Sequence, residues 1–182
     1  MGKLYDTLTP ELRAWLAEQK VFFVATAPLD AAGHVNCSPK GGDTFRVLGD
    51  RAAAYLDLTG SGIETVSHLQ ENGRIVLMFC AFDGGPKIVR LHGHGEVLMP
   101  SHPDFAAVSV AFPALPGVRA IVRVTVDRIS DSCGFGVPQM EFVAARDTLG
   151  RWAEKQGDTG LAAYRQEKNS LSIDGLPGYR AS

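Results

Sequence analysis

The chain has few cysteines and no long apolar run. Its 182 residues contain Cys37, Cys80 and Cys133, with no closely spaced pair. An odd number of scattered thiols argues against a disulfide framework or a cysteine zinc site and favours a reducing compartment such as the cytoplasm. No apolar stretch approaches the roughly 20 residues of a membrane-spanning helix. Residues 1–15 lack the apolar core of a signal peptide.

The chain also has no large excess of charge of either sign. There are 18 Lys and Arg residues against 20 Asp and Glu residues, which gives a net charge of −2. Such a balance provides no general field for binding nucleic acid, and we expect neither a nucleic-acid nor a membrane partner. The sequence contains no internal repeat or low-complexity tract. A length of 182 residues with 45% hydrophobic residues is typical of one globular domain.

Most of the chain consists of short apolar segments separated by turn residues. This pattern predicts a mainly β protein. The predicted strands cover residues 21–27, 34–38, 44–48, 52–58, 74–82, 87–98 and 119–129. The predicted helices cover residues 10–16, 64–70 and 103–112, and a region from 146 onward with a break near 157–160. Hairpins with a few peripheral helices predict a small barrel or a sandwich.

The segment YLDLTGSGIET, residues 55–65, is the most informative for function. It reads as a strand that ends in a Gly/Ser/Thr turn and then enters a helix. Such a turn leaves backbone N–H groups free, and a helix N-terminus favours negative charge, so it can hold a phosphate. The alternative is an ordinary helix cap, in which Thr59 or Ser61 bonds its own backbone. Local sequence favours the cap.

Other polar residues each allow two interpretations. His92 and His94 share a strand face and could bind a metal, but no third ligand has suitable spacing, so we predict no metal site. Cys37 could be a nucleophile, although a buried structural thiol is the commoner case. Asp57 could accept a bond from a ligand or cap the turn, and Glu64 fits a first-turn acid better than a catalytic base.

In their order and spacing these segments resemble the pyridoxamine-phosphate-oxidase-like family of FMN-binding split barrels. The resemblance covers roughly residues 10–133 and rests on the N-terminal helix, the strand 21–27, HVNCSPKGG, YLDLTGSGIET, NGRIVLMFCAF and KIVRLHGHGEVL. It implies a split β-barrel flavin-binding domain over residues 1–135. Residues 136–182 would then be a C-terminal helical extension packed on the same domain.

The resemblance also implies FMN in a groove between the two subunits of a homodimer. Residues of the strand ending at Lys40 would face the flavin ring or its ribityl chain, namely Asn36, Ser38 and Lys40. The turn would lie along the ribityl-phosphate through Leu58, Thr59, Gly60 and Ser61. Arg90 would add positive charge near the phosphate, which is best bound by charge-assisted donors.

One departure from the family pattern limits the function that can be carried over. Oxidases of the vitamin B6 pathway have an Arg-Lys pair just after the serine of this turn, where this chain has Gly62 and Ile63. We therefore expect no oxidation of pyridoxamine phosphate. The expectation is an FMN-dependent oxidoreductase acting on an unknown small substrate, with NADH, NADPH or an organic molecule as its redox partner. The sequence singles out no catalytic residue. The alternatives are a non-catalytic flavin sensor or store, or a relative that binds deazaflavin or haem.

Overall fold

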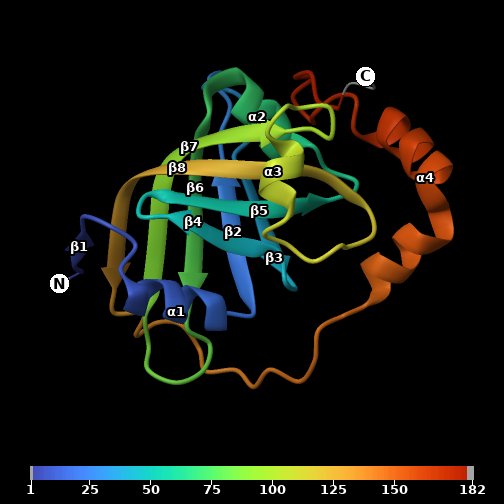
Figure 1. The fold of residues 1–182 in the computed structure, drawn as a ribbon. Helices are drawn as coiled ribbons and strands as arrows, with labels where there is room; N and C mark the ends of the chain where they lie inside the picture. The colour runs from blue at the N-terminus through green and yellow to red at the C-terminus, as the bar shows by residue number, and fades with distance from the viewer. Residues whose placement is uncertain (1, 180–182) are drawn as a thin grey trace.

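A curled antiparallel sheet forms the body of the protein in the computed structural model, which describes residues 2–179 (Figure 1). The eight strands found in this range are β1 (Leu4–Tyr5), β2 (Val21–Thr26), β3 (Asn36–Gly41), β4 (Phe45–Gly49), β5 (Ala52–Leu58), β6 (Arg74–Cys80), β7 (Ile88–Leu98) and β8 (Val118–Ser132). The helices are α1 (Pro10–Glu18), α2 (Glu64–Asn72), α3 (Phe105–Ser109) and α4 (Thr148–Lys168). The mainly β prediction is confirmed.

The sheet is a barrel with an opening along one side. Its strand order is β3-β2-β6-β7-β8-β5-β4, and β1 pairs with β8. The strands β3 and β4 are therefore the two edges, and the barrel is not closed by a ladder between them. Side chains meet across this opening instead, because Lys40 of β3 lies 3.0 Å from Asp57 of β5. This is the split β-barrel expected from the sequence.

The core fills the interior of the curled sheet. Alternate residues of β5 point inward, so Ala53 and Tyr55 join the main apolar cluster. The ring of Phe22 stacks on that of Phe79 at 5.2 Å and meets the ring of Tyr55 at 5.7 Å. The outward residues of β5 are covered by α3, which explains why this strand is buried on both faces. Asp57 shares the inward face and therefore lies at the end of the core.

The helices take different places around the sheet. Figure 1 shows α1 and α2 at opposite ends of the barrel, with α4 to one side after a long connection beneath α1. Thr9 caps α1 by accepting a bond from the Leu12 N–H, and Pro10 occupies the first turn. Gly73 ends α2 with a φ of 71°, a conformation that favours glycine. The predicted break in the last helix is found at Gly157, whose φ is 61°.

The range of β3, the length of α3 and the exposure of one thiol differ most from expectation. The strand β3 covers Asn36–Gly41 rather than 34–38. The backbone N–H of His34 bonds Asp174 outside the ladder, and at the other end the pairing with β2 continues as far as Gly41. The helix predicted over 103–112 is regular only over Phe105–Ser109. The preference for a buried Cys37 is wrong, since this residue lies on the outward face of the edge strand and is exposed.

Candidate functional site

The turn between β5 and α2 is open and rich in free backbone donors. The ladder between β5 and β8 shifts register at Asp57 and Leu58, and the chain then leaves the sheet. Within residues 2–179, the N–H groups of Gly60, Ser61 and Gly62 have no hydrogen-bond acceptor. The N-cap of α2 is Ile63, which offers no capping side chain. The free donors and the helix N-terminus together make a site suited to an anion.

This geometry decides against the ordinary cap. The Thr59 hydroxyl donates to the Gly117 carbonyl at 2.8 Å, and the Thr59 N–H bonds the same oxygen. Neither Thr59 nor Ser61 bonds a backbone N–H of α2 in the described structure. Adjacent to the turn, Glu64 is the one acid in the first turn of α2, and its carboxylate accepts a bond from the Ile173 N–H at 3.4 Å.

A buried charge triad lies behind the turn. The Asp57 carboxylate is 1% exposed and accepts two bonds from Arg119, at 2.7 and 2.9 Å, and one from Lys40 at 3.0 Å. The third nitrogen of Arg119 donates to the Gly62 carbonyl at 3.0 Å. Burial alone would raise the pKa of Asp57, but the charges of Lys40 and Arg119 outweigh it and lower that pKa. The triad thus carries one net positive charge at neutral pH.

The inward face of β3 extends this polar network toward α2. The Asn36 amide donates to the Thr65 hydroxyl at 2.9 Å and to the Thr26 hydroxyl at 3.2 Å. The Ser38 hydroxyl donates to the Asn36 carbonyl oxygen at 3.0 Å. Thr26 in turn lies 2.9 Å from Nδ1 of His68, a fully buried residue whose pKa is lowered by burial. Polar contacts therefore run continuously from β3 to the first turn of α2.

A cavity of about 450 Å³ opens between the start of β3 and the turn. Its lining residues are His34, Val35, Asn36, Cys37, Ser61, Gly62, Glu64 and Ile173. The structure therefore brings Asn36 and Ser61, predicted from two separate motifs, into one cavity. Ser38 and Lys40 lie on the same face of β3 as Asn36, while Leu58, Thr59 and Gly60 lead from β5 into the turn.

Arg90 is not brought to this cavity within one chain. It lies on β7 opposite Ser130, near the end of β8, whereas Leu58 lies opposite Val118 at the start of β8. Its guanidinium donates to the Ser132 hydroxyl at 3.1 Å. Arg90 belongs to a site at the turn only if a partner subunit brings it there.

Arg119, Arg165 and Asn169 were missed by sequence reasoning, although all three bond the turn or its flanks. A signal existed for Arg119, because an arginine opening an otherwise apolar strand needs a buried partner. The contacts of Arg165 with Thr59 and of Asn169 with Gly60 and Ser61 span more than a hundred residues of sequence and carry no local signal.

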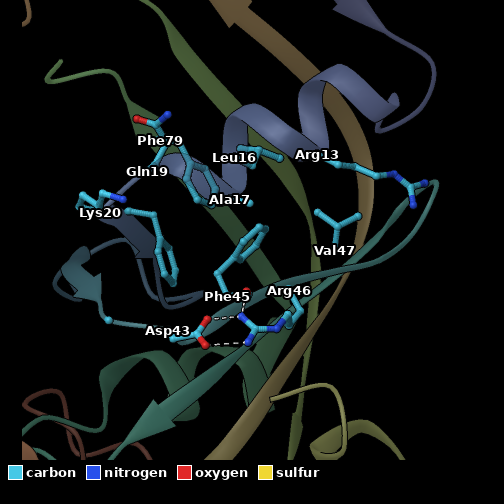
Figure 2. Close-up of a pocket in the computed structure, with 12 residues that line it drawn as sticks. Arg13, Leu16, Ala17, Gln19, Lys20, Asp43, Phe45, Arg46, Val47 and Phe79 are labelled. Carbon is cyan, nitrogen blue, oxygen red and sulfur yellow. Dashed lines mark hydrogen bonds and ion pairs between the residues drawn. The ribbon is translucent and has the colours of Figure 1, made fainter. Parts of the chain in front are cut away.

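A second cavity, of about 360 Å³, lies between α1 and β4 (Figure 2). Its walls include the rings of Phe22, Phe45 and Phe79, and its rim includes Lys20 and Arg46. Figure 2 shows Arg46 bonded to Asp43, with one of these bonds at 2.9 Å. None of the predicted site residues lines this cavity.

Within the described residues, no three His, Cys, Asp or Glu side chains gather as metal ligands. His94 bonds Asp127 at 2.9 Å, and burial lowers the pKa of His92. None of the described helices is long and apolar enough to span a membrane.

Comparison with known families decides the relationship of this chain. The family model described as pyridoxamine 5'-phosphate oxidase matches residues 8–133. The chain belongs to the pyridoxamine 5'-phosphate oxidase family. A relative from Aspergillus flavus, the pyridoxamine 5'-phosphate oxidase family protein ustO, is 38% identical over 199 residues, which cover 100% of this chain and 80% of the relative. The similarity to this relative therefore includes the region after residue 133, which the family model does not match.

Solved structures share the fold of this family member at lower identity. A HupZ variant of Group A Streptococcus is 24% identical with a TM-score of 0.54, covering 69% of this chain and 99% of that chain. A FAD-binding protein of Mesorhizobium loti is 14% identical with a TM-score of 0.50, covering 72% and 95%. These two likenesses support the split-barrel architecture.

Proposed function

We propose that this family member is an FMN-dependent oxidoreductase that acts on a small molecule as a homodimer. The observation that carries the proposal is the turn after β5, where Ser61 and Gly62, whose N–H groups are free, line an open cavity at the N-terminus of α2. These donors fit a phosphomonoester, the group that distinguishes FMN from riboflavin. The net positive triad behind the turn compensates in part for the missing Arg-Lys pair.

The residues of β3 would orient the flavin. Asn36 lines the cavity beside Ser61, and Ser38 holds the Asn36 amide in place through its hydroxyl. Lys40 is held by Asp57, so its charge would act on a bound flavin from a fixed position. Bound FMN supplies hydride chemistry, to which the protein adds orientation and electrostatics. The electron donor would be NADH, NADPH or an organic substrate.

A partner subunit would complete the groove. A barrel of this size fills its interior with side chains, so a ligand as long as FMN lies outside it. The cavity over the turn is open on one side, and Val35 and Ile173 line it while remaining exposed. A second copy of the chain covering them would enclose the ligand. The three unpaired cysteines suit a reducing compartment, and we propose the cytoplasm.

The proposal is tested by titrating the purified protein with FMN and following flavin fluorescence and absorption. We expect saturable quenching below tens of micromolar, an affinity on the order of −6 kcal/mol or better. Bound flavin that NADH or NADPH reduces at steady state supports an oxidoreductase. Bound flavin that no donor reduces favours a sensor or store. If the absorption spectrum of the purified protein is that of haem or a deazaflavin, then that cofactor, and not FMN, is the ligand.

A further inference from the structure

The end of α4 and the residues after it lie against the turn between β5 and α2. We call residues 165–179 the C-terminal strap. The Arg165 guanidinium donates to the Thr59 hydroxyl at 2.9 Å and to the Val118 carbonyl at 3.1 Å. It also lies 5.7 Å from the ring centre of Tyr179. A cation from outside the region matched by the family model thus stands at the first residue of the turn.

Asn169 holds the next two residues of the turn. Its side-chain N–H₂ group donates to the Gly60 carbonyl at 2.9 Å and to the Ser61 carbonyl at 3.3 Å. The residue is fully buried, and its side-chain oxygen has no partner within residues 2–179. Its position is fixed by the strap itself, since the Tyr179 N–H bonds the Asn169 carbonyl at 2.6 Å.

The strap fits closely and also reaches the other wall of the cavity. A Cβ atom at Gly178 would lie 2.5 Å from the Asn169 carbonyl oxygen and 2.7 Å from the Ile63 side chain, so only glycine fits there. The Asp174 carboxylate accepts a hydrogen bond from the backbone N–H of His34 at 2.8 Å, and its other oxygen lies 2.6 Å from Nδ1 of the same histidine. The strap thus connects the start of β3 with the start of α2.

These contacts determine which way the turn's donors point. In a trans peptide unit the C=O of one residue and the N–H of the next point in opposite directions. Asn169 binds the carbonyls of Gly60 and Ser61, and Arg119 binds that of Gly62. The N–H groups that follow them, on Ser61, Gly62 and Ile63, are therefore directed away from the strap and from Arg119.

We propose that Arg165 and Asn169 are positioning residues of the phosphate site: Asn169 fixes the turn so that successive N–H groups point toward one anion, and Arg165 fixes Thr59, the first residue of the turn. This inference rests on the proposed function. It assigns a role to a segment beyond the matched domain, and it predicts that the phosphate end of the ligand depends on this segment while the ring end does not.

The test compares four variants in the full-length chain. Asn169→Ala removes the two bonds to the turn, Arg165→Met removes the bond to Thr59 at similar side-chain length, and Arg165→Lys restores a donor for Thr59. Arg151→Ala is the control, since Arg151 lies on the same helix and its exposed guanidinium pairs with Asp147. Circular dichroism and thermal melting establish that each variant is folded. Dissociation constants are then measured for FMN, riboflavin and inorganic phosphate.

We expect Asn169→Ala and Arg165→Met to weaken FMN binding about tenfold, because a turn that is no longer held would lose about one of its hydrogen bonds to the phosphate. Riboflavin binding should change less than twofold in both variants, Arg165→Lys should recover part of the loss, and Arg151→Ala should match the wild type. An equal loss for riboflavin and FMN, or no loss for either, overturns the inference.

A second measurement separates this inference from the proposed function. Backbone ¹⁵N order parameters of Gly60, Ser61 and Gly62 are recorded without ligand. We expect values of about 0.85 in the wild type and below about 0.6 in Asn169→Ala. If the wild type binds no flavin, the proposed function fails. The inference then stands only if the turn loses order and inorganic phosphate binds more weakly in Asn169→Ala, and unchanged order parameters overturn it.

Discussion

At the scale of single residues, Arg119 is the member of the buried triad that folding depends on most. Its side chain is 4% exposed against 22% for Lys40, and it contacts both Asp57 and the Gly62 carbonyl. Removing one partner of a buried ion pair costs about 3–5 kcal/mol, because the other charge is left uncompensated. We expect Arg119→Met to lower the free energy of unfolding by about that amount.

Lys40→Met is the matched comparison for this first prediction. It should cost about 1–3 kcal/mol, because its ammonium is partly hydrated and Asp57 keeps the two bonds from Arg119. Both values come from urea unfolding monitored by fluorescence. Losses below 1 kcal/mol for both variants would contradict the buried triad.

The shifted pKa of the buried His68 leads to a prediction of how the free energy of unfolding changes with pH. Burial lowers its pKa in the folded protein, against the opposing charges of Asp174, Glu64 and Glu71. Between that lowered pKa and about 6.5, the unfolded chain binds a proton that the folded protein does not. Stability should therefore fall as pH drops below about 6.5. His68→Gln should show a smaller fall when urea unfolding is compared at about pH 7.5 and 5.5.

His92 is the confounding group in that measurement. Its pKa is also lowered, first by burial and then by Arg128 and Arg90, so it adds to the same pH dependence. His92→Gln and the double variant separate the two contributions. A pH dependence that is unchanged in the double variant would assign it to other groups.

At the scale of elements, the pairing of β7 with β8 depends on a glycine. The ladder shifts register at His92 and Gly93. A Cβ atom at Gly93 would lie 2.0 Å from the Thr125 carbonyl oxygen, which belongs to the backbone and cannot rotate away. Adding a methyl group to a tightly packed site typically costs about 1–3 kcal/mol. We expect Gly93→Ala to lower the free energy of unfolding by at least that amount. Thermal unfolding followed by circular dichroism measures the loss.

Gly49→Ala is the control for the Gly93 variant. Gly49 also lies in a strand, but its Cβ atom would lie 3.7 Å from the Ala52 side chain, an ordinary contact. This variant should change stability by less than about 0.5 kcal/mol. Equal effects at the two glycines would show that the close approach of β7 and β8 is not what matters.

The elements that sequence predicted best are those with a strong local pattern. Thr9, Pro10 and the apolar stripe of α1 act within one helix, and Gly73 ends α2 by its own backbone conformation. The start of β3 could not be predicted, because it depends on Asp174, 140 residues away. The segment Leu4–Tyr5 was also missed as a strand, since two residues have no periodicity and pair with β8 only through the tertiary fold.

In the candidate site, too, the residues of local motifs could be predicted from the sequence, and those that depend on distant contacts could not. The turn 59–62 and the face of Asn36, Ser38 and Lys40 were predicted through the family resemblance, and the structure places Asn36 and Ser61 of this set in one cavity. The departure at Gly62 and Ile63 was visible in the sequence, but the cations near the turn were not. Arg119 and Arg165 approach the turn through β8 and α4, so only the folded chain shows which cations stand behind it.

At the scale of the whole molecule, the proposed homodimer would use the surface around the cavity over the turn as its interface. Val35 is 74% exposed and Ile173 is 70% exposed, and both line the cavity over the turn. Adjacent exposed apolar side chains at a cavity are typical of an interaction surface. A partner covering them would bury this surface and close the open side of the ligand groove. Flavin bound between two subunits would then stabilise the dimer by mass action.

The dimer is tested by light scattering coupled to size exclusion, with and without FMN. We expect the wild type to be a dimer and Val35→Glu to shift it toward monomer, because a carboxylate would be buried without a partner. Val110→Glu is the control, since Val110 is 83% exposed and follows α3, outside the cavity. FMN affinity should fall in Val35→Glu in proportion to the loss of dimer. A monomeric wild type that binds FMN tightly would refute both the interface and the shared groove.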